Sequence, residues 1–551
     1  MDIKRLILFV IFSFSILMLW DSWQKKDVPN VVPVLGTANQ DASIPIAGSI
    51  STNVPSVNSS VPSQGTVFKL NSAQRIKVAT DLYQAEIDTV GGDLRRLTLN
   101  KHRASDSQDG FLLLDDSATP MLYVAQTGLI GADLPTHKSI FTTTASSYSM
   151  PSTAETQEVS LHWIGKDGIT VDKIYTFHRN NYVIDVTYQI NNRSNNAIMP
   201  TAYYQILHDN KSNQGSKMMP TFTGGAYYTE SDKFKKIKFS DMEKEKLNKT
   251  ANDGWVGLVQ HYFASAWIPK VGVARVFYTD KIADDIYSIG TKIPLGIVAA
   301  NTKFEVKTEF FAGPQTHSDL VAAAPGLEYT VDYGWLTVVA KPIFWILTKI
   351  QVIVVNWGVA IILLTLLIKL AFYPLSAASY RSMAKMRELA PRLQALKDKF
   401  GDDKQKMQQA MMELYKIEKI NPMGGCLPIL VQVPVFISLY WVLLGSIELR
   451  HAPFFGWIHD LSAIDPFYIL PILMGATMII QTKLNPKPTD PIQAKVMQIM
   501  PVVFSIFFFF FPAGLVLYWL VNNILSITQQ WYINKTIHAE ALASKSGHFK
   551  K

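Results

Sequence analysis

The chain has 551 residues, too many for one ordinary domain, and its single cysteine, Cys426, excludes an intrachain disulfide. Hydrophobic residues make up 48% and charged residues 17%, below the roughly 25% charged residues of soluble proteins. The apolar excess lies in one N-terminal segment and in the part after Lys341, so the net charge of +8 is better interpreted by position than in bulk.

The first 66 residues predict a membrane anchor and a tether. Lys4 and Arg5 precede the apolar stretch Leu6–Trp20, and the flank DSWQKKD offers no small-x-small cleavage site. A cleaved signal peptide would begin similarly, but we favour an uncleaved signal-anchor helix over 1–24, with its N-terminus in the cytoplasm. Residues 25–66 contain five prolines, seven serines and no aromatic residue, which predicts a disordered linker.

Residues 67–325 predict a β-sandwich domain. Hydrophobic residues alternate along Ile169–Phe177 and again along Tyr182–Ile190, and Asn180-Asn181 lies between them, which is the pattern of a β-hairpin. Such strands, without long apolar helical stretches, predict a large sandwich with a few short helices. The stretch Asp232–Lys249 is crowded with lysines and acids and predicts a solvated surface segment.

This domain shows no pattern typical of an enzyme. Its histidines are scattered without the spacing of metal ligands. The sequence contains no glycine-rich phosphate loop, nucleophile elbow or HExxH motif. We therefore expect no catalytic residue, no metal and no cofactor, and no binding to DNA.

The membrane part begins with a connector over 326–350, in which Pro342–Ile350 is apolar with one lysine. That segment is either the start of the next span or an interfacial amphipathic helix. A transmembrane helix is expected over 351–375, since the 24 residues Val352–Leu375 reach about 36 Å as a helix and the hydrocarbon core is roughly 30 Å thick. Its one charge, Lys369, shares a stripe with Thr365 and Tyr373. Lys369 either snorkels to the headgroups or faces a hydrated interior.

Residues 376–425 predict a cytoplasmic antiparallel helical hairpin. Met386, Leu389 and Leu393 recur at spacings of three and four, and Gly401-Asp402-Asp403 forms a turn with a helix cap. Pro391 should kink the first arm. The alternative is a simple connector, for which this segment is long.

Four further apolar stretches predict transmembrane helices over 426–446, 467–482, 496–511 and 513–533, separated by a periplasmic loop (447–466) and a cytoplasmic loop (483–495) and followed by a basic cytoplasmic tail (534–551). Ten Lys+Arg residues lie in 376–424, three in 482–497 and four in 531–551, whereas 445–466 carries only Arg450. The positive-inside rule then predicts six transmembrane helices, both termini in the cytoplasm and the β domain in the periplasm.

Polar side chains recur within these spans: Thr365, Lys369, Gln432, Asn522, Asn523 and Ser526. Any one of them could simply join helices, but together they predict a shared hydrated groove, which argues against a snorkelling lysine. No acidic residue lies in the apolar stretch Leu6–Trp20 or in the other five spans, which disfavours an ion-coupled transporter.

The C-terminal half resembles the YidC/Oxa/Alb family of membrane insertases. The matching motifs are VDYGW at Val331–Trp335, KLAFYPL at Lys369–Leu375, SMAKMRELAP at Ser382–Pro391, NPMGGCLP at Asn421–Pro428, the loop Leu449–Gly475 and FPAGLVLYWLVNN at Phe511–Asn523. The anchor, linker and β domain agree with the six-span bacterial form of that family, of which five helices form the core.

The resemblance implies a bacterial inner-membrane insertase and chaperone, not an enzyme, that works alone or with the Sec translocon through a cytoplasm-open hydrophilic groove. Its partners would be nascent membrane proteins, the Sec translocon, the ribosome and membrane lipids. Lys369 stands where the family places a basic residue, often arginine, and the implied contacts to the substrate helix are Phe436, Met474, Phe507, Tyr518 and Trp519. The rival reading is a polytopic solute transporter with a periplasmic ligand-binding domain, which predicts internal repeats that the sequence lacks.

Overall fold

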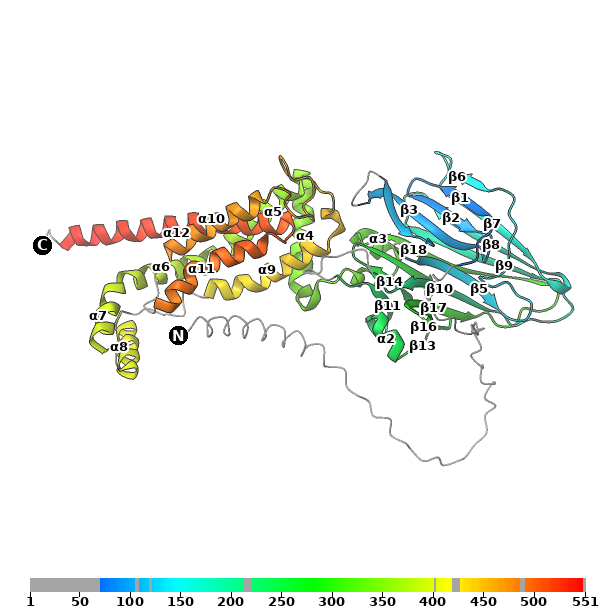
Figure 1. Cartoon of the computed structure of the whole chain (residues 1–551), viewed down its shortest axis with the longest axis horizontal. Coiled ribbons are helices and arrows are strands. Elements are labelled where there is room, and N and C mark those ends of the chain that lie inside the picture. Colours follow the sequence, from blue (N-terminus) through cyan, green and yellow to red (C-terminus); the bar gives the residue numbers. More distant parts are fainter. Residues whose placement is uncertain are drawn as a thin grey trace, which may run out of the picture. The chain divides into compact units, whose positions relative to one another are not determined.

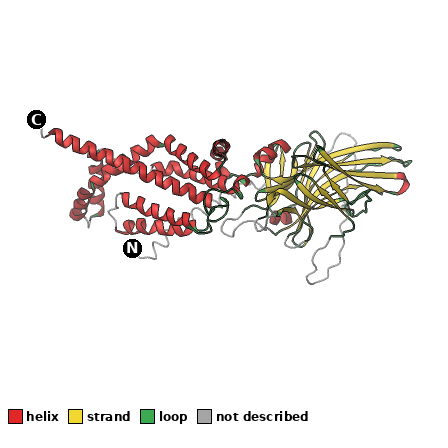
Figure 2. Cartoon of the chain, turned by 90° about the horizontal axis from the view of Figure 1, so that it is seen from above, coloured by secondary structure: helices red, strands yellow, loops and turns green. Residues whose placement is uncertain are grey.

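The computed structural model describes residues 70–104, 109–117, 121–211, 221–400, 403–418, 427–485 and 491–548. The expected anchor over 1–24 and linker over 25–66 lie outside these described residues. Strands make up the first described part of the chain and helices make up the second (Figure 2).

Two sheets face each other in the β domain (Figure 1). The first sheet has the order β13 (Asn248–Ala251), β16 (Arg275–Ala283), β17 (Ile286–Pro294), β10 (Thr201–Asp209), β5 (Tyr123–Ile130), β3 (Asp93–Arg103), β2 (Tyr83–Asp88), β1 (Arg75–Ala79) and β6 (Ser147–Ser149), and β4 (Gly110–Leu114) pairs with β3. The second has the order β12 (Lys233–Ile237), β11 (Gly224–Thr229), β14 (Trp255–Gln260), β15 (Phe263–Pro269), β18 (Thr302–Pro314), β9 (Val183–Asn192), β8 (Ile169–His178) and β7 (Thr156–Ile164). The expected β-sandwich is therefore confirmed as a two-sheet fold.

Alternating side chains of both sheets form the core. In the hairpin β8–β9, Phe177 pairs with Ile184 in antiparallel register, and the inward residues of β8 are all buried. Hydroxyl groups also join the sheets, since Tyr83 Oη donates to the Ala312 carbonyl at 2.8 Å and Thr127 Oγ1 lies 2.7 Å from Tyr188 Oη. Such bonds satisfy polar groups that burial would otherwise leave without a partner.

Three charged side chains lie inside this apolar core. Lys173 occupies an inward position of β8 and donates to the Gly91 carbonyl at 3.0 Å. Its Nζ lies 3.9 Å from Asp93 Oδ1, and Arg95 Nη2 lies 3.4 Å from Asp93 Oδ2. Burial raises the pKa of Asp93 to about 6 and lowers the pKa of Lys173 to about 8.

The stretch Asp232–Lys249, expected as a solvated surface segment, contains regular secondary structure. It contains β12 and α2 (Phe239–Lys244) and reaches the start of β13. β12 and β13 are end strands of the two sheets. Lysines on an end strand oppose pairing with another chain, and the buried Met242 anchors α2.

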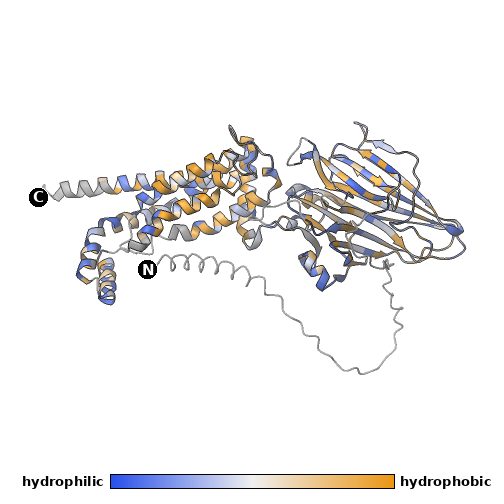
Figure 3. Cartoon of the chain, in the orientation of Figure 1, coloured by the Kyte–Doolittle hydropathy of each residue, from blue (hydrophilic) through white to orange (hydrophobic). Residues whose placement is uncertain are grey.

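The helical part comprises α4 (Thr337–Val354), α5 (Trp357–Ala371), α6 (Tyr373–Glu388), α7 (Ala390–Phe400), α8 (Lys404–Ile417), α9 (Leu427–Gly445), α10 (Ile469–Leu484), α11 (Pro491–Phe508) and α12 (Ala513–His548), while α3 (His317–Ala323) follows the last strand. Hydrophobic residues dominate α9, α10 and α11, whereas α7 and α8 carry many hydrophilic ones (Figure 3). α12 packs against α5, α6, α9 and α10, and it continues well beyond the span expected to end at residue 533.

The apolar stretch expected as one helix over 351–375 is divided. α4 contains the Pro342–Ile350 segment and ends before Val355, which has a left-handed φ of 54°. Asn356 then caps α5 by accepting from the Val359 amide at 3.0 Å. α5 has 15 residues and is followed by α6 after a bend of 67°. Continuous hydrophobicity hid this break, because a single asparagine is a weak signal within an apolar run.

Judged by length and composition, one described helix, Gly334–Val354, is long and apolar enough to cross a membrane. The bent α5–α6 pair would be a second such span, and Val431–Gly445, Ile469–Leu484 and Ala494–Phe508 are shorter apolar helices. The expected count of six spans therefore remains a proposal.

The segment expected as a helical hairpin forms two helices, α7 and α8, that pack together. Leu389 and Leu393 are buried there against Met411 and Leu414. The helix breaks between α6 and α7 just before Pro391, where proline disfavours a continuous helix. Asp403 caps α8 by accepting from the Lys406 amide at 3.1 Å.

Asp465 organises the loop before α10. Its carboxylate is fully buried and accepts from the Leu470 amide at 2.7 Å, the Phe467 amide at 3.1 Å and Trp457 Nε1 at 3.0 Å. It therefore caps the first turn of α10 and fixes the preceding loop.

Asp465→Ala should lower the free energy of unfolding by about 2 kcal/mol, because buried donors lose a charged acceptor. Thermal unfolding of the detergent-solubilised chain would measure the change. Asp460→Ala is the control, since Asp460 lies in the same loop but is partly exposed and accepts from Ser462 in a local turn. Equal shifts in melting temperature for the two variants would contradict this role.

Candidate functional site

Lys369 lies in the last turn of α5 and points into the helical bundle. Its side chain is 6% exposed, and Nζ donates to Ser526 Oγ on α12 at 2.7 Å. Ser526 in turn donates to the Asn522 carbonyl at 2.7 Å. Within the described part of the chain, no carboxylate forms an ion pair with Lys369. The ammonium group thus bonds to a neutral hydroxyl oxygen of the neighbouring helix.

A second set of polar contacts joins α12 to α10 and to Asn485, the residue that follows α10. Asn523 Nδ2 donates to Thr477 Oγ1 at 3.3 Å, and Gln530 Nε2 donates to Asn485 Oδ1 at 3.2 Å. Asn523, Ser526 and Gln530 follow the helical spacing i, i+3, i+7. One stripe of α12 therefore makes polar contacts with both α5 and α10.

The structure brings together some, but not all, of the residues expected to line the groove. Thr365 is buried one turn before Lys369, and its hydroxyl donates to the Ile361 carbonyl of its own helix at 2.6 Å. Gln432 on α9 is half-buried, and no hydrogen bond joins it to Lys369 or Ser526 among the described residues. Hydrogen bonds connect Lys369 to Ser526 and Ser526 to the Asn522 backbone. Gln432 has no hydrogen bond to these residues in the described part of the chain.

Thr477, Asn485 and Gln530 were not among the site residues expected from the sequence. The sequence does place Gln530 on one face of the last helix with Asn523 and Ser526, one turn beyond Ser526, but the expected groove did not include it. Thr477 and Asn485 gave no such signal, because a threonine in an apolar helix and an asparagine after it are both common.

The five expected substrate contacts differ in exposure. Met474 and Tyr518 are buried in the bundle core, whereas the Phe507 side chain is 43% exposed. Phe436 meets Trp519 edge to face, with ring centroids 4.4 Å apart, and stacks on Tyr518 at 6.1 Å. In this conformation, Phe507 is the one of the five most open to an approaching helix.

Two buried polar atoms near these aromatic residues have no partner among the described residues. They are Trp519 Nε1 and Ser438 Oγ. A buried donor without a partner is costly. No group of three or more His, Cys, Asp or Glu side chains suited to a metal ion occurs in the described ranges.

Comparison with known proteins covers the whole chain. The sequence-family model described as "YidC periplasmic domain" matches residues 75–346, and the family model described as "60Kd inner membrane protein" matches residues 348–540. A membrane protein insertase YidC of Methylobacillus flagellatus is 65% identical over 555 residues, covering 100% of both chains. One from Aromatoleum aromaticum is 50% identical over 552 residues, covering 99% of this chain and 100% of that one. A crystal structure of an active YidC insertase with its first transmembrane domain resolved has a TM-score of 0.39 at 20% identity, covering 84% of this chain and 93% of that one.

Proposed function

This chain belongs to the YidC family of membrane protein insertases, and we propose that it inserts integral membrane proteins into the inner membrane and helps them to fold, alone or with the Sec translocon. Full-length similarity to proteins named as insertases supports this function. The rival reading, a solute transporter, has no support among these relatives.

The proposed mechanism rests on one geometric observation, the buried side chain of Lys369 on α5. Lys369, bonded to Ser526, offers a positive charge inside an otherwise apolar bundle. We propose that this polar region draws the hydrophilic end of a nascent segment partway into the membrane. The apolar part of the segment then moves into lipid, and this step yields about 0.8 kcal/mol per buried CH₂.

Short helices would assist this transfer. α5 has 15 residues and α10 has 16, which correspond to about 22 and 24 Å at 1.5 Å per residue. A hydrocarbon core of roughly 30 Å must thin beside helices of that length. A thinner bilayer shortens the path of a polar tail through hydrocarbon.

Photocrosslinking to a stalled nascent membrane protein tests the function. A photoreactive residue at the exposed Phe507 or at Trp519 should crosslink to the nascent chain. The same residue at the buried Met474 should do so much less, which makes it a matched control on a neighbouring helix. If neither Phe507 nor Trp519 crosslinks while the variants support growth, the substrate path lies elsewhere.

We further propose a topology of six spans, with the α7–α8 hairpin, the 483–495 loop and both termini in the cytoplasm. The excess of lysine and arginine in these segments supports it. The basic segments after α10 and in the tail then form a face for the translating ribosome, while the Sec translocon acts beside the bundle.

Replacing the basic residues of 482–497 and of the tail after Trp531 by glutamine should weaken ribosome binding. The salt dependence of binding should also become shallower, because fewer cations then bind phosphates of the ribosomal RNA. Co-sedimentation with ribosomes at low and high salt would measure both effects. The matched control replaces an equal number of lysines in the β domain. Unchanged co-sedimentation at low salt would contradict the proposal.

A further inference from the structure

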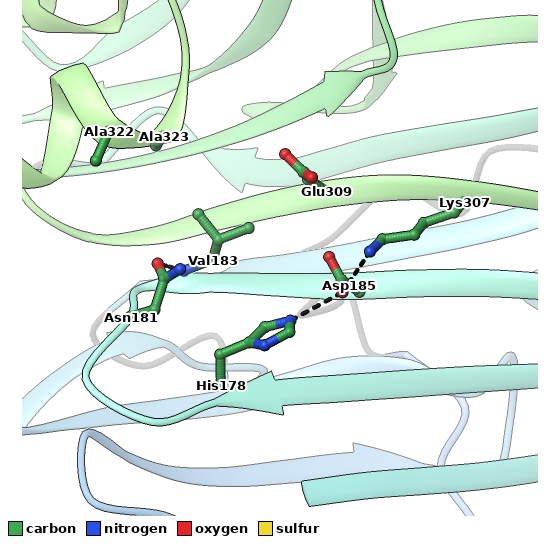
Figure 4. Close-up of a pocket in the computed structure, with 8 residues that line it drawn as sticks. All are labelled: His178, Asn181, Val183, Asp185, Lys307, Glu309, Ala322 and Ala323. Atoms are coloured by element: carbon green, nitrogen blue, oxygen red, sulfur yellow. Dashed lines mark hydrogen bonds and ion pairs between the residues drawn. The ribbon is translucent and has the colours of Figure 1, made fainter. Parts of the chain in front are cut away.

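A small cavity opens on the β domain, far in sequence from the groove. It has a volume of about 230 Å³ and is lined by the start of β9, by β18 and by the end of α3 (Figure 4). This volume is below the roughly 300–1,000 Å³ of typical small-molecule pockets. The cavity therefore suits one side chain rather than a large ligand.

Two carboxylates face each other across paired strands in this cavity. Asp185 on β9 and Glu309 on β18 are direct cross-strand partners. Asp185 has a partner on both sides, since Lys307 Nζ lies 2.6 Å and His178 Nε2 lies 2.8 Å from its Oδ2 (Figure 4). Like charges directly opposite each other are otherwise unfavourable in a sheet.

The Glu309 carboxylate has no direct partner of this kind, although Lys307 and His178 oppose the rise of its pKa from nearby. Its side chain is half-buried, and its carboxylate forms no hydrogen bond or ion pair with any residue that the structure describes. Burial and the neighbouring Asp185 raise the pKa of Glu309. A cation brought to this carboxylate would remove that cost.

The remaining walls suit the stem of a basic side chain. Val183, Ala322 and Ala323 line one side of the cavity (Figure 4). Methylene groups of lysine or arginine pack well on such small apolar surfaces while the charged head pairs elsewhere. Asn181 Oδ1 is already used by the Val183 amide at 3.0 Å, so it does not compete with Glu309 for the head group.

We propose that this cavity binds one basic side chain, lysine or arginine, of a peptide segment, with its charged head on Glu309 and its stem along Val183 and the end of α3. This binding site goes beyond membrane insertion and does not depend on it. It would let the β domain hold a basic segment of a partner or of an exported chain.

Saturation-transfer NMR on the full-length chain in detergent micelles tests the proposal with three probes: the Nα-acetyl methylamides of lysine, arginine and norleucine. The lysine and arginine compounds should both bind, and comparing their affinities shows which head group the cavity prefers. The norleucine compound, which has the four-carbon stem of lysine without the ammonium group, should bind at least tenfold more weakly. Glu309→Gln should weaken binding of the cationic probes by roughly tenfold or more, as expected for loss of a charge-assisted hydrogen bond.

Two further variants sharpen the test. Glu305→Gln is the matched control, because Glu305 lies four residues away on the same face of β18 and is bonded to Gln189 at 3.0 Å. It should leave binding unchanged. Lys307→Gln should strengthen binding severalfold, since it leaves Asp185 with less compensation.

Equal binding of norleucine and lysine, or full affinity of a folded Glu309→Gln variant, would overturn the proposal. If Glu309→Gln fails to fold, Lys307→Gln decides, and weaker binding there would likewise overturn it.

Discussion

Replacing Lys369 by leucine should reduce insertion of substrates with acidic exported tails by roughly tenfold or more, whereas Lys369→Arg should insert them normally. A charge-assisted contact of a tail carboxylate contributes about 1.5–3 kcal/mol, which corresponds to at least that factor. The cation offsets part of the desolvation cost of the acidic tail. Substrates with uncharged tails should depend on Lys369 much less.

Ser526→Ala separates the charge from the hydrogen bond. This variant removes the acceptor at 2.7 Å but leaves the ammonium group in place. If the charge is what matters, Ser526→Ala should lose less insertion than Lys369→Leu. Insertion into vesicles containing the purified variants, with matched acidic and neutral tails, measures the difference. A leucine variant that inserts both substrates like the parent would show that Lys369 is structural.

The β domain illustrates what could be predicted from sequence. The hairpin β8–β9 follows from alternation with a period of two, because a strand buries every second side chain. The same rule gave no reason to place Lys173 inside, since lysine is almost never fully buried unless paired. Its partner Asp93 lies on a different sheet, so neither burial could be inferred from local pattern.

The polar contact between α5 and α12 shows the same limit over a longer distance. Lys369 and Ser526 were both expected in a polar site, because each interrupts an apolar helix. Their direct bond joins residues separated by 157 positions, which no periodicity reveals. The burial of Met474, expected as a substrate contact, also depends on how α10 is rotated in the bundle, and helical spacing alone leaves that rotation open.

Lys173→Met should lower the free energy of unfolding by about 3 kcal/mol, because removing one member of a buried charged cluster leaves Asp93 with less compensation, from the Arg95 contact at 3.4 Å. For a domain of this size, the melting temperature should fall by roughly 6–12 °C. Thermal unfolding of the full chain in detergent would detect it. Lys303→Met is the control, since Lys303 is exposed on β18 and should change stability by less than about 0.5 kcal/mol.

A double-mutant cycle tests whether the cluster acts as a unit. Asp93→Asn and Lys173→Met together should cost less than the sum of the two single changes, because the second change removes the partner that the first had left with less compensation. In the double variant Arg95 loses its contact with the Asp93 carboxylate and keeps its bond to the Asn71 carbonyl at 3.4 Å. Additive losses would mean that the lysine stabilises through its bond to Gly91 instead.

The pH dependence of stability tests the burial of Asp93 independently. The pKa of Asp93 is raised to about 6 in the folded chain, so its favourable contribution is complete below the unfolded pKa, about 4, and is lost as pH rises through 6. Parent stability relative to Asp93→Asn should therefore decrease between pH 4 and pH 7. The lowered pKa of Lys173 makes stability increase with pH, but only as pH rises above about 8. It therefore does not alter the decrease expected between pH 4 and pH 7. A parent chain that gains stability over the Asn variant across pH 4–7 would mean that the salt bridges to Lys173 and Arg95 outweigh the burial of Asp93.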